Sequence, residues 1–199
     1  MMPISDPVGA PGLVALALGF VLFAVALIAA RRRGQRDAAE GSGRRANSSI
    51  LWIVLQGVAI GLAGFGPIHI GLDPLSPAGL TCALIVLALM LGAVFLFDWS
   101  SRAMGRNWAL VARTRGDASL VTTGPFAYVR NPIYVALALF MIAMAIAYGH
   151  ARMLVIAAPL YALATWMRVA VEEKLLRAEF GAAYIAYTAR VKRFVPGIL

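Results

Sequence analysis

Five runs of mostly apolar residues alternate with polar connections along the chain. They cover about residues 12–30, 50–70, 79–97, 132–148 and 151–171. A hydrocarbon core about 30 Å thick requires roughly 20 apolar residues in a spanning helix. The pattern therefore predicts an all-α, polytopic membrane protein with about five transmembrane helices.

Helical periodicity also extends into the polar segments. Apolar and basic side chains interleave over residues 98–112, which predicts an amphipathic helix on the membrane surface. The fifth helix is expected to project beyond the membrane and to be followed, after Gly181, by a second amphipathic helix over residues 184–194. Because little more than Gly149 and His150 joins the last two runs, these are predicted to form a tight antiparallel hairpin.

Composition supports the membrane class, and the charge distribution suggests an orientation. Of the 199 residues 61% are hydrophobic and 14% are charged, a balance too apolar for a soluble core of this size. Despite the net charge of +9, basic residues fill alternate connections, at 31–45, 102–130 and 174–193, whereas the others carry only Arg152. This pattern follows the positive-inside rule and argues against nucleic acid as a partner. It places the N-terminus outside and the C-terminus in the cytoplasm.

Residue usage bears on the cellular compartment and on whether disulfides or metal sites can form. The frequent Ala and Arg residues and the absence of a targeting signal favour a bacterial inner membrane. The single cysteine, Cys82, excludes a disulfide within the chain. Because His69 and His150 lie in separate connections, we predict no metal site.

The polar stretch before the fourth run has an unusual composition for a simple connection. Residues 124–134 read Gly-Pro-Phe-Ala-Tyr-Val-Arg-Asn-Pro-Ile-Tyr. Pro132 suits the first turn of the following helix, where its missing N–H has no helical partner. The aromatic side chains of Phe126, Tyr128 and Tyr134, with main-chain groups freed by the prolines, predict a binding loop for a flat heterocycle.

Two ionisable residues follow at the end of the fifth run. Arg168 and Glu172 are four residues apart and therefore share one helical face. The hairpin returns them to the same side of the membrane as residues 130–134. Near a membrane boundary such groups are costly unless they are paired or used. We expect Glu172 to accept hydrogen bonds from hydroxyl or ammonium groups and Arg168 to bind a carboxylate; the alternative is a snorkelling arginine with a structural partner.

Together these residues resemble a known family. Residues 124–134, the sequence Arg168-Val-Ala-Val-Glu172-Glu173 and the later Phe-Gly-Ala-Ala-Tyr-Ile-Ala-Tyr at 180–187 are similar to the isoprenylcysteine carboxyl methyltransferases. The related phospholipid N-methyltransferases share part of the pattern. The resemblance covers roughly residues 101–196. It implies an integral membrane methyltransferase that binds S-adenosylmethionine on the cytoplasmic side and receives a lipophilic small-molecule substrate from the surrounding membrane lipids.

The resemblance also implies a division of the chain and roles for individual residues. Residues 1–100 hold the first three spans, and residues 101–199 form the catalytic half with the cofactor-binding loop, the hairpin and the C-terminal amphipathic helix. Arg168 and Glu172 are the candidate catalytic residues, and Arg168 is expected to bind the substrate carboxylate. Cofactor-binding roles are implied for Leu120, Val121, Phe126, Asn131, Pro132, Ile133, Tyr134 and Glu172.

Two positions depart from the family pattern. The family commonly has Tyr where this chain has Phe126, and His where it has Asn131. Asparagine can donate and accept hydrogen bonds, but it does not titrate near pH 7 as histidine does. A mechanism that needs a general base at position 131 is therefore not expected here.

The leading hypothesis is methylation of a carboxylate on an isoprenyl-like or other hydrophobic small molecule. A carboxylate is already ionised at neutral pH, so no general base is required. Phospholipid or amine N-methylation is the alternative, in which Glu172 or Glu173 accepts the proton of the amine. A sterol-type reductase with a nicotinamide cofactor and a similar Arg-x-Pro-x-Tyr turn, and a non-enzymatic lipid-binding module, are further alternatives.

Overall fold

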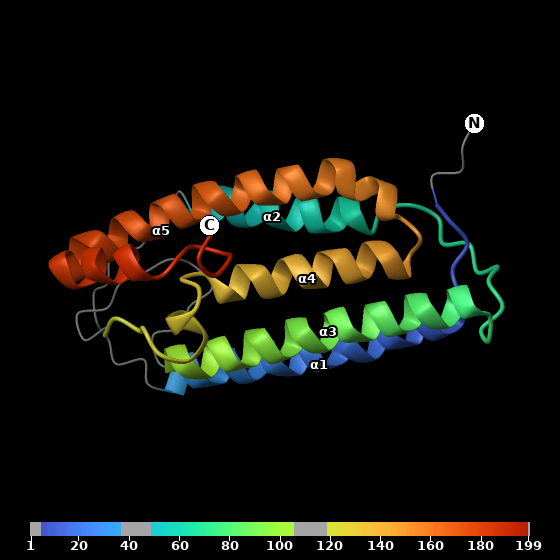
Figure 1. Cartoon of the computed structure of the whole chain (residues 1–199), viewed down its shortest axis with the longest axis horizontal. Coiled ribbons are helices and arrows are strands. Elements are labelled where there is room, and N and C mark those ends of the chain that lie inside the picture. The colour runs from blue at the N-terminus through green and yellow to red at the C-terminus, as the bar shows by residue number, and fades with distance from the viewer. Residues whose placement is uncertain (1–4, 37–48, 106–118, 199) are drawn as a thin grey trace.

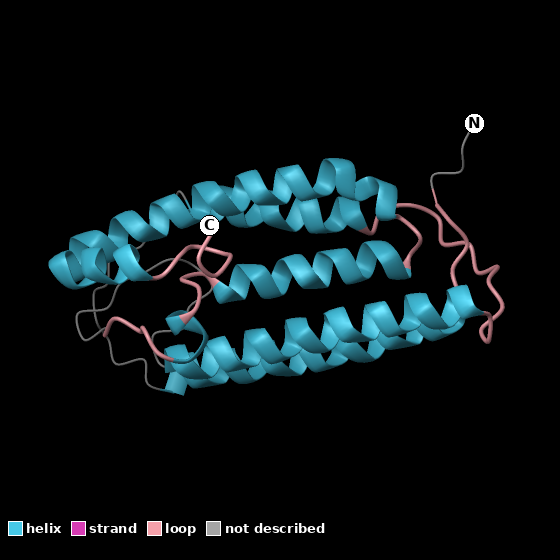
Figure 2. Ribbon diagram, in the orientation of Figure 1, coloured by secondary structure: helices cyan, strands magenta, loops and turns pink. Residues whose placement is uncertain are grey.

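The computed structural model describes residues 5–36, 49–105 and 119–198, which form an elongated bundle of helices (Figure 1). Three helices are long: α1 (Ala10–Arg36), α3 (Pro77–Met104) and α5 (Leu154–Arg190). Two are shorter, α2 (Ser49–Ala63) and α4 (Pro132–Ala147), and two 3₁₀ turns, η2 (Gly124–Ala127) and η3 (Ala151–Met153), precede α4 and α5. Loops alone connect them in the described ranges, which contain no strand (Figure 2). The predicted all-α class is confirmed.

The helices have the length and composition of membrane spans. By these criteria the segments Ala10–Gly34, Pro77–Met104 and Ala151–Arg190 are able to cross a membrane. The apolar helices α2 and α4 are shorter, with 15 and 16 residues. Large apolar side chains are exposed along the bundle, as at Phe95 and Val155, where lipid rather than water is the favourable surrounding. The chain is an integral membrane protein.

The second helix is shorter than the apolar run that predicts it. It ends at Ala63 and not near residue 70, because Gly66 adopts a φ of 141° and Pro67 has no N–H to donate. The backbone beyond this point pairs instead with the N-terminal segment: the amide of Val8 donates to the carbonyl of His69 at 2.9 Å. This backbone pairing lies at the end of the bundle where α1 begins and α2 ends.

The third helix is longer than predicted. It continues past residue 97 to Met104, because the polar residues at its end are used within the helix. The hydroxyl of Ser100 donates to the carbonyl of Leu96, and Arg102 pairs with Asp98, one turn away, at 2.6 Å. The first part of the expected amphipathic segment 98–112 is therefore a continuation of α3. Residues 106–112 lie outside the described residues.

Helix α4 occupies the middle of the bundle, with α1 and α3 on one side and α2 and α5 on the other (Figure 1). Buried apolar residues such as Phe23, Phe97 and Ala136 join α1, α3 and α4. Ala59, Met141 and other small or flexible side chains join α2, α4 and α5. The last two helices are antiparallel, as expected, but α5 packs more extensively along α2 than along α4.

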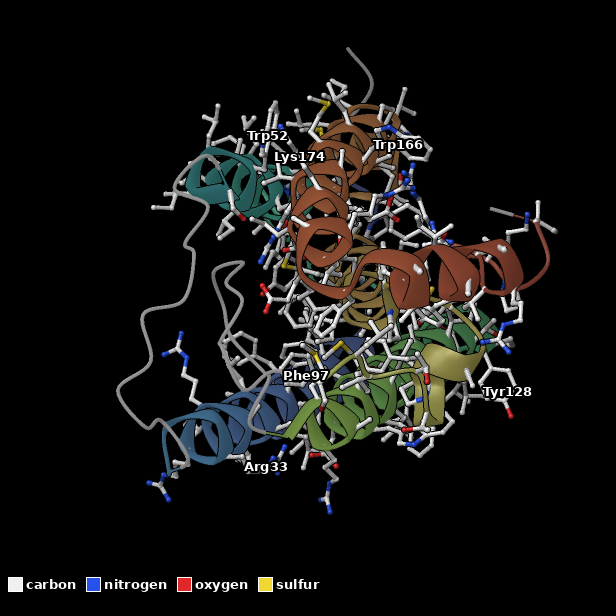
Figure 3. All side chains as sticks on the ribbon, turned by 90° about the vertical axis from the view of Figure 1, so that its left-hand side faces the viewer. Arg33, Trp52, Phe97, Tyr128, Trp166 and Lys174 are labelled. Carbon is white, nitrogen blue, oxygen red and sulfur yellow. The ribbon has the colours of Figure 1, made fainter. Side chains whose placement is uncertain are left out.

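The end of α5 turns at Gly181, whose φ of 47° and ψ of −122° interrupt the helix. The remaining part runs across the end of the bundle above η2 (Figure 3). The hydroxyl of Tyr187 holds it there by donating to the carbonyl of Phe126 at 2.6 Å. The expected second amphipathic helix is present but ends at Arg190 instead of residue 194, because the backbone of 192–193 is engaged by the loop before α4.

Candidate active site

Tyr134 and Glu172 join α4 to α5. Tyr134 lies in the first turn of α4, which Pro132 begins. Its hydroxyl donates to the two carboxylate oxygens of Glu172 at 2.6 and 2.8 Å. The side chain of Tyr134 is buried, whereas that of Glu172 remains 20% exposed. The predicted meeting of the 130–134 turn with the Arg168–Glu172 face is therefore present in the structure.

Arg168 completes this cluster from one helical turn earlier. Its Nε donates to Oε1 of Glu172 at 3.1 Å, and its guanidinium carbon lies 5.0 Å from the centroid of the Tyr134 ring. The Arg168 side chain is only 8% exposed. A cation over an aromatic face and beside a carboxylate is held electrostatically on two sides. We refer to Tyr134, Arg168 and Glu172 as the polar cluster.

A residue of α2 extends the polar cluster. The side-chain oxygen of Gln56 accepts from Nη1 of Arg168 at 2.8 Å, and its amide nitrogen donates to Oγ1 of Thr165 at 2.8 Å. Sequence reasoning did not identify Gln56. A signal was available, because Gln56 is the one amide or charged residue within the second apolar run, and a buried amide requires hydrogen-bond partners.

A second ionic network lies beside the polar cluster. Both oxygens of Glu173 are bound, Oε1 by Arg130 and Oε2 by Arg193, at 2.8 and 2.7 Å. Nη1 of Arg130 also donates to the carbonyls of Thr188 and Val191. The hydrogen bonds from Arg193 to Glu173 raise the pKa of the Arg193 guanidinium, because the carboxylate stabilises its charged form. We refer to Arg130, Glu173 and Arg193 as the ionic clamp.

The ionic clamp works with the backbone to fasten the C-terminal segment to the loop before α4. The amide of Arg130 donates to the carbonyl of Lys192 at 2.8 Å, and that of Asn131 to the carbonyl of Arg193 at 3.0 Å. The side chain of Asn131 adds a longer bond, 3.3 Å, to the same carbonyl. The guanidinium of Arg193 stacks on Trp166, 4.3 Å from its centroid. These contacts give Asn131 a structural role in the loop.

The other predicted residues occupy different surroundings. Leu120 and Val121 are half-buried in the non-helical segment before η2. Phe126 is buried in η2, and Ile133 packs against the core that contains Phe97. Their cofactor-binding roles remain predictions.

Tyr128 does not join the polar cluster. It was predicted to line the binding loop, but its side chain is 63% exposed and points away from the bundle (Figure 3). Its ring centroid lies 6.4 Å from that of Trp99 on α3. The reason is local: Pro125 and Phe126 of η2 are buried, and the next two residues, Ala127 and Tyr128, are exposed.

The polar cluster offers a carboxylate, a phenol hydroxyl, an aromatic face and a guanidinium at one end of the bundle. Such a set suits an organic ligand that carries cationic, hydroxyl or carboxylate groups. Among the described residues no group of three or more His, Cys, Asp or Glu side chains is arranged to hold a metal ion.

Comparison with known proteins agrees with the sequence resemblance. Residues 79–183, just over half of the 199 residues, match the phospholipid methyltransferase family. This range contains Tyr134, Arg168, Glu172 and Glu173 but neither Gln56 nor Arg193. No curated protein matches the chain. The family match confirms the resemblance to membrane methyltransferases drawn from the 124–134 and 168–173 segments, and the chain belongs to the phospholipid methyltransferase family.

Proposed function

We propose that this membrane methyltransferase transfers the methyl group of S-adenosylmethionine to a carboxylate on an isoprenyl-like or other hydrophobic small molecule. The observation that carries the proposal is the polar cluster, in which Tyr134, Arg168 and Glu172 converge from α4 and α5 within the family-matched residues. The same match disfavours the nicotinamide-dependent reductase and the non-enzymatic lipid-binding module.

The side chains of the polar cluster fit the cofactor by their hydrogen-bonding chemistry. Glu172, partly exposed and bound by the hydroxyl of Tyr134, suits the ammonium or hydroxyl groups of S-adenosylmethionine. We assign main-chain groups of the loop at 120–134 to the adenosyl part of the cofactor, as the family resemblance implies. When bound, this cofactor supplies an electrophilic methyl group, which leaves sulfur for the acceptor oxygen.

Arg168 is assigned to the acceptor. Its planar guanidinium can bind a carboxylate with two parallel hydrogen bonds, which orients the nucleophilic oxygen. Because the acceptor is ionised at neutral pH, the chain has only to align it and to exclude water. Burial of Arg168 within the helices supports both tasks, since its side chain is 8% exposed.

Amine methylation is a second candidate, favoured by the phospholipid methyltransferase family match. An ammonium acceptor has to lose a proton before it can attack. Of the two adjacent glutamates, Glu173 is held by Arg130 and Arg193 and is 6% exposed. Glu172 is therefore the group that this alternative requires as proton acceptor.

We further propose that the polar cluster faces the cytoplasm of a bacterial cell, with the N-terminus outside the inner membrane. Arg33 and Arg102 lie near the C-terminal ends of α1 and α3, which Figure 1 shows at the end of the bundle where α4 begins. Arg130 and Arg193 bind Glu173 beside the polar cluster. Arg152 belongs to η3, which lies at the other end of α4. This distribution supports the orientation by the positive-inside rule. Residues 101–199 then form the catalytic half, with its polar cluster at the cytoplasmic end.

A product search tests the proposal. Membranes containing the protein are incubated with methyl-labelled S-adenosylmethionine, and lipid extracts are analysed by mass spectrometry. We expect a labelled lipid-soluble product whose label is released as methanol by alkali, as an ester requires. A labelled product stable to alkali would favour the amine instead. Membranes with Glu172→Gln serve as the control. No product, together with no binding of S-adenosylhomocysteine to the purified protein, would overturn the proposal.

A further inference from the structure

We infer that Gln56 of α2 is a positioning residue that fixes the guanidinium of Arg168 for an anionic acceptor, so that α2 forms part of the acceptor site. The inference rests on the proposed role of Arg168. It goes beyond the family match, because that match begins at residue 79, after the whole of α2 (Ser49–Ala63). The proposed specificity of the site thus depends on a helix outside the matched residues.

The amide of Gln56 is held in a single orientation. Gln56 is 3% exposed, and both ends of its amide have protein partners. The guanidinium of Arg168 contains only donors, so the amide oxygen must face it. The amide nitrogen then points to the hydroxyl of Thr165, which lies three residues before Arg168 on the same helical face. If the amide were flipped, its NH₂ group would face the guanidinium of Arg168, and two hydrogen-bond donors would meet.

Three helices then constrain one guanidinium group. Glu172 of α5 binds Nε of Arg168, Gln56 of α2 binds Nη1, and the Tyr134 ring of α4 lies against the group. Because the guanidinium is planar, fixing two of its nitrogens fixes the plane of the whole fork. The direction from which a carboxylate can be bound is therefore decided before the acceptor arrives.

The neutrality of Gln56 matters for the charge of the acceptor. Arg168 already faces the carboxylate of Glu172 at 3.1 Å. A second carboxylate at position 56 would add a negative charge beside the guanidinium and repel an anionic acceptor. A glutamine orients the guanidinium without that charge. An apolar residue would leave Arg168 Nη1 without this acceptor.

A purely structural role for Gln56 makes different predictions. Helix α2 packs closely along α5, and a hydrogen bond between membrane helices contributes to their association. A residue that only joins the helices would affect folding stability and would alter cofactor and acceptor binding together. A residue that positions Arg168 would change acceptor binding selectively.

The experiment compares Gln56→Leu and Gln56→Glu with the unmodified protein. N-acetyl-S-farnesylcysteine serves as the carboxylate probe and S-adenosylhomocysteine as the cofactor probe, and binding of each is measured by calorimetry in detergent. Initial rates with labelled S-adenosylmethionine give the KM for the carboxylate probe. We expect Gln56→Leu to weaken binding of the carboxylate probe, and to raise its KM, about tenfold or more. Cofactor-probe affinity should change by less than about threefold. Gln56→Glu should weaken carboxylate binding further.

Two further variants separate positioning from stability. Thr165→Val is nearly isosteric and removes the partner of the Gln56 amide nitrogen, so it should shift carboxylate binding in the same direction by a smaller factor, even where Gln56→Leu fails to fold. Met141→Ala opens a cavity in the apolar cluster shared by α2, α4 and α5, away from Arg168. It should lower the melting temperature without a selective change in carboxylate affinity.

Each contrary outcome has its own meaning. If the unmodified protein binds the cofactor probe but not the carboxylate probe, the inference is overturned and the methyltransferase proposal stands. Unchanged carboxylate binding in Gln56→Leu and Thr165→Val, or a parallel loss for both probes, also overturns it. If the unmodified protein binds no S-adenosylhomocysteine and forms no methylated product, the proposed function itself is overturned.

Discussion

The hydroxyl of Tyr134 donates to both carboxylate oxygens of Glu172, at 2.6 and 2.8 Å, and so ties the first turn of α4 to α5. Toward the opposite end of the bundle, apolar residues such as Met141 and Ala157 join the same two helices. The two helices are thus held by apolar packing at one end and by hydrogen bonds at the other.

Loss of the Tyr134 hydroxyl should weaken cofactor binding. In Tyr134→Phe the ring still lies against Arg168, but Glu172 loses its hydroxyl donor. A hydrogen bond to a charged group contributes about 1.5–3 kcal/mol, so we expect the affinity for S-adenosylhomocysteine to fall at least about tenfold in titration calorimetry. Tyr148→Phe, at the other end of α4, is the matched control. Equal affinities for the two variants would show that this hydrogen bond does not shape the cofactor site.

Arg168→Ala should affect the acceptor more than the cofactor. The substitution removes the proposed carboxylate-binding fork, so the KM for a prenylated carboxylate should rise by about two orders of magnitude, as expected for loss of a charge-assisted bidentate contact. Arg168→Lys keeps the positive charge beside Glu172 but not the fork, and it should retain cofactor affinity while still raising the KM. Steady-state kinetics with both substrates varied would measure this. Equal losses for cofactor and acceptor would contradict the assigned role.

Glu173→Gln should loosen the C-terminal segment. The substitution leaves Arg130 and Arg193 without the carboxylate that both contact, and breaking a buried ion pair costs about 3–5 kcal/mol. Amide hydrogen exchange followed by mass spectrometry should show faster exchange over residues 188–193. Glu179→Gln provides the control, because Glu179 lies on the same helix but is exposed. Unaltered exchange in Glu173→Gln would mean that the backbone pairing alone holds the segment.

Asn131→Ala should have little effect on cofactor affinity. The side-chain bond to the Arg193 carbonyl is 3.3 Å long, and the backbone amide of Asn131 supplies a shorter one of 3.0 Å to the same oxygen. A neutral hydrogen bond contributes about 0.5–1.5 kcal/mol, so S-adenosylhomocysteine affinity should stay within about a factor of three by calorimetry. A loss above tenfold would indicate that the Asn131 side chain itself contacts the cofactor.

Much of the fold follows from the sequence because hydrophobic length and helical period are local properties. Each of the apolar runs contains a helix, and the four-residue spacing placed Arg168 and Glu172 on one face. Because α4 and α5 are consecutive and antiparallel, that face lies at the same end of the bundle as Tyr134. Helix ends were predicted less accurately, because local backbone chemistry decides them. The hydroxyls of Ser100 and Ser101 donate to carbonyls within α3, and Gly66 and Pro67 follow the end of α2.

The partners of the polar side chains were decided only by the tertiary structure. Gln56 and Arg168 are separated by 112 residues along the chain and meet because α2 packs on α5 and not on its sequence neighbours. Arg193 reaches Glu173 only because α5 turns at Gly181 and returns the C-terminal segment to the loop before α4. The sequence by itself determined where along the chain the helices lie and which residues share a helical face. The rotation of each helix and the turn at Gly181 determined which of those faces meet. The physical reason is that contacts between helices depend on tertiary packing, whereas the periodicity of a sequence describes each helix only by itself.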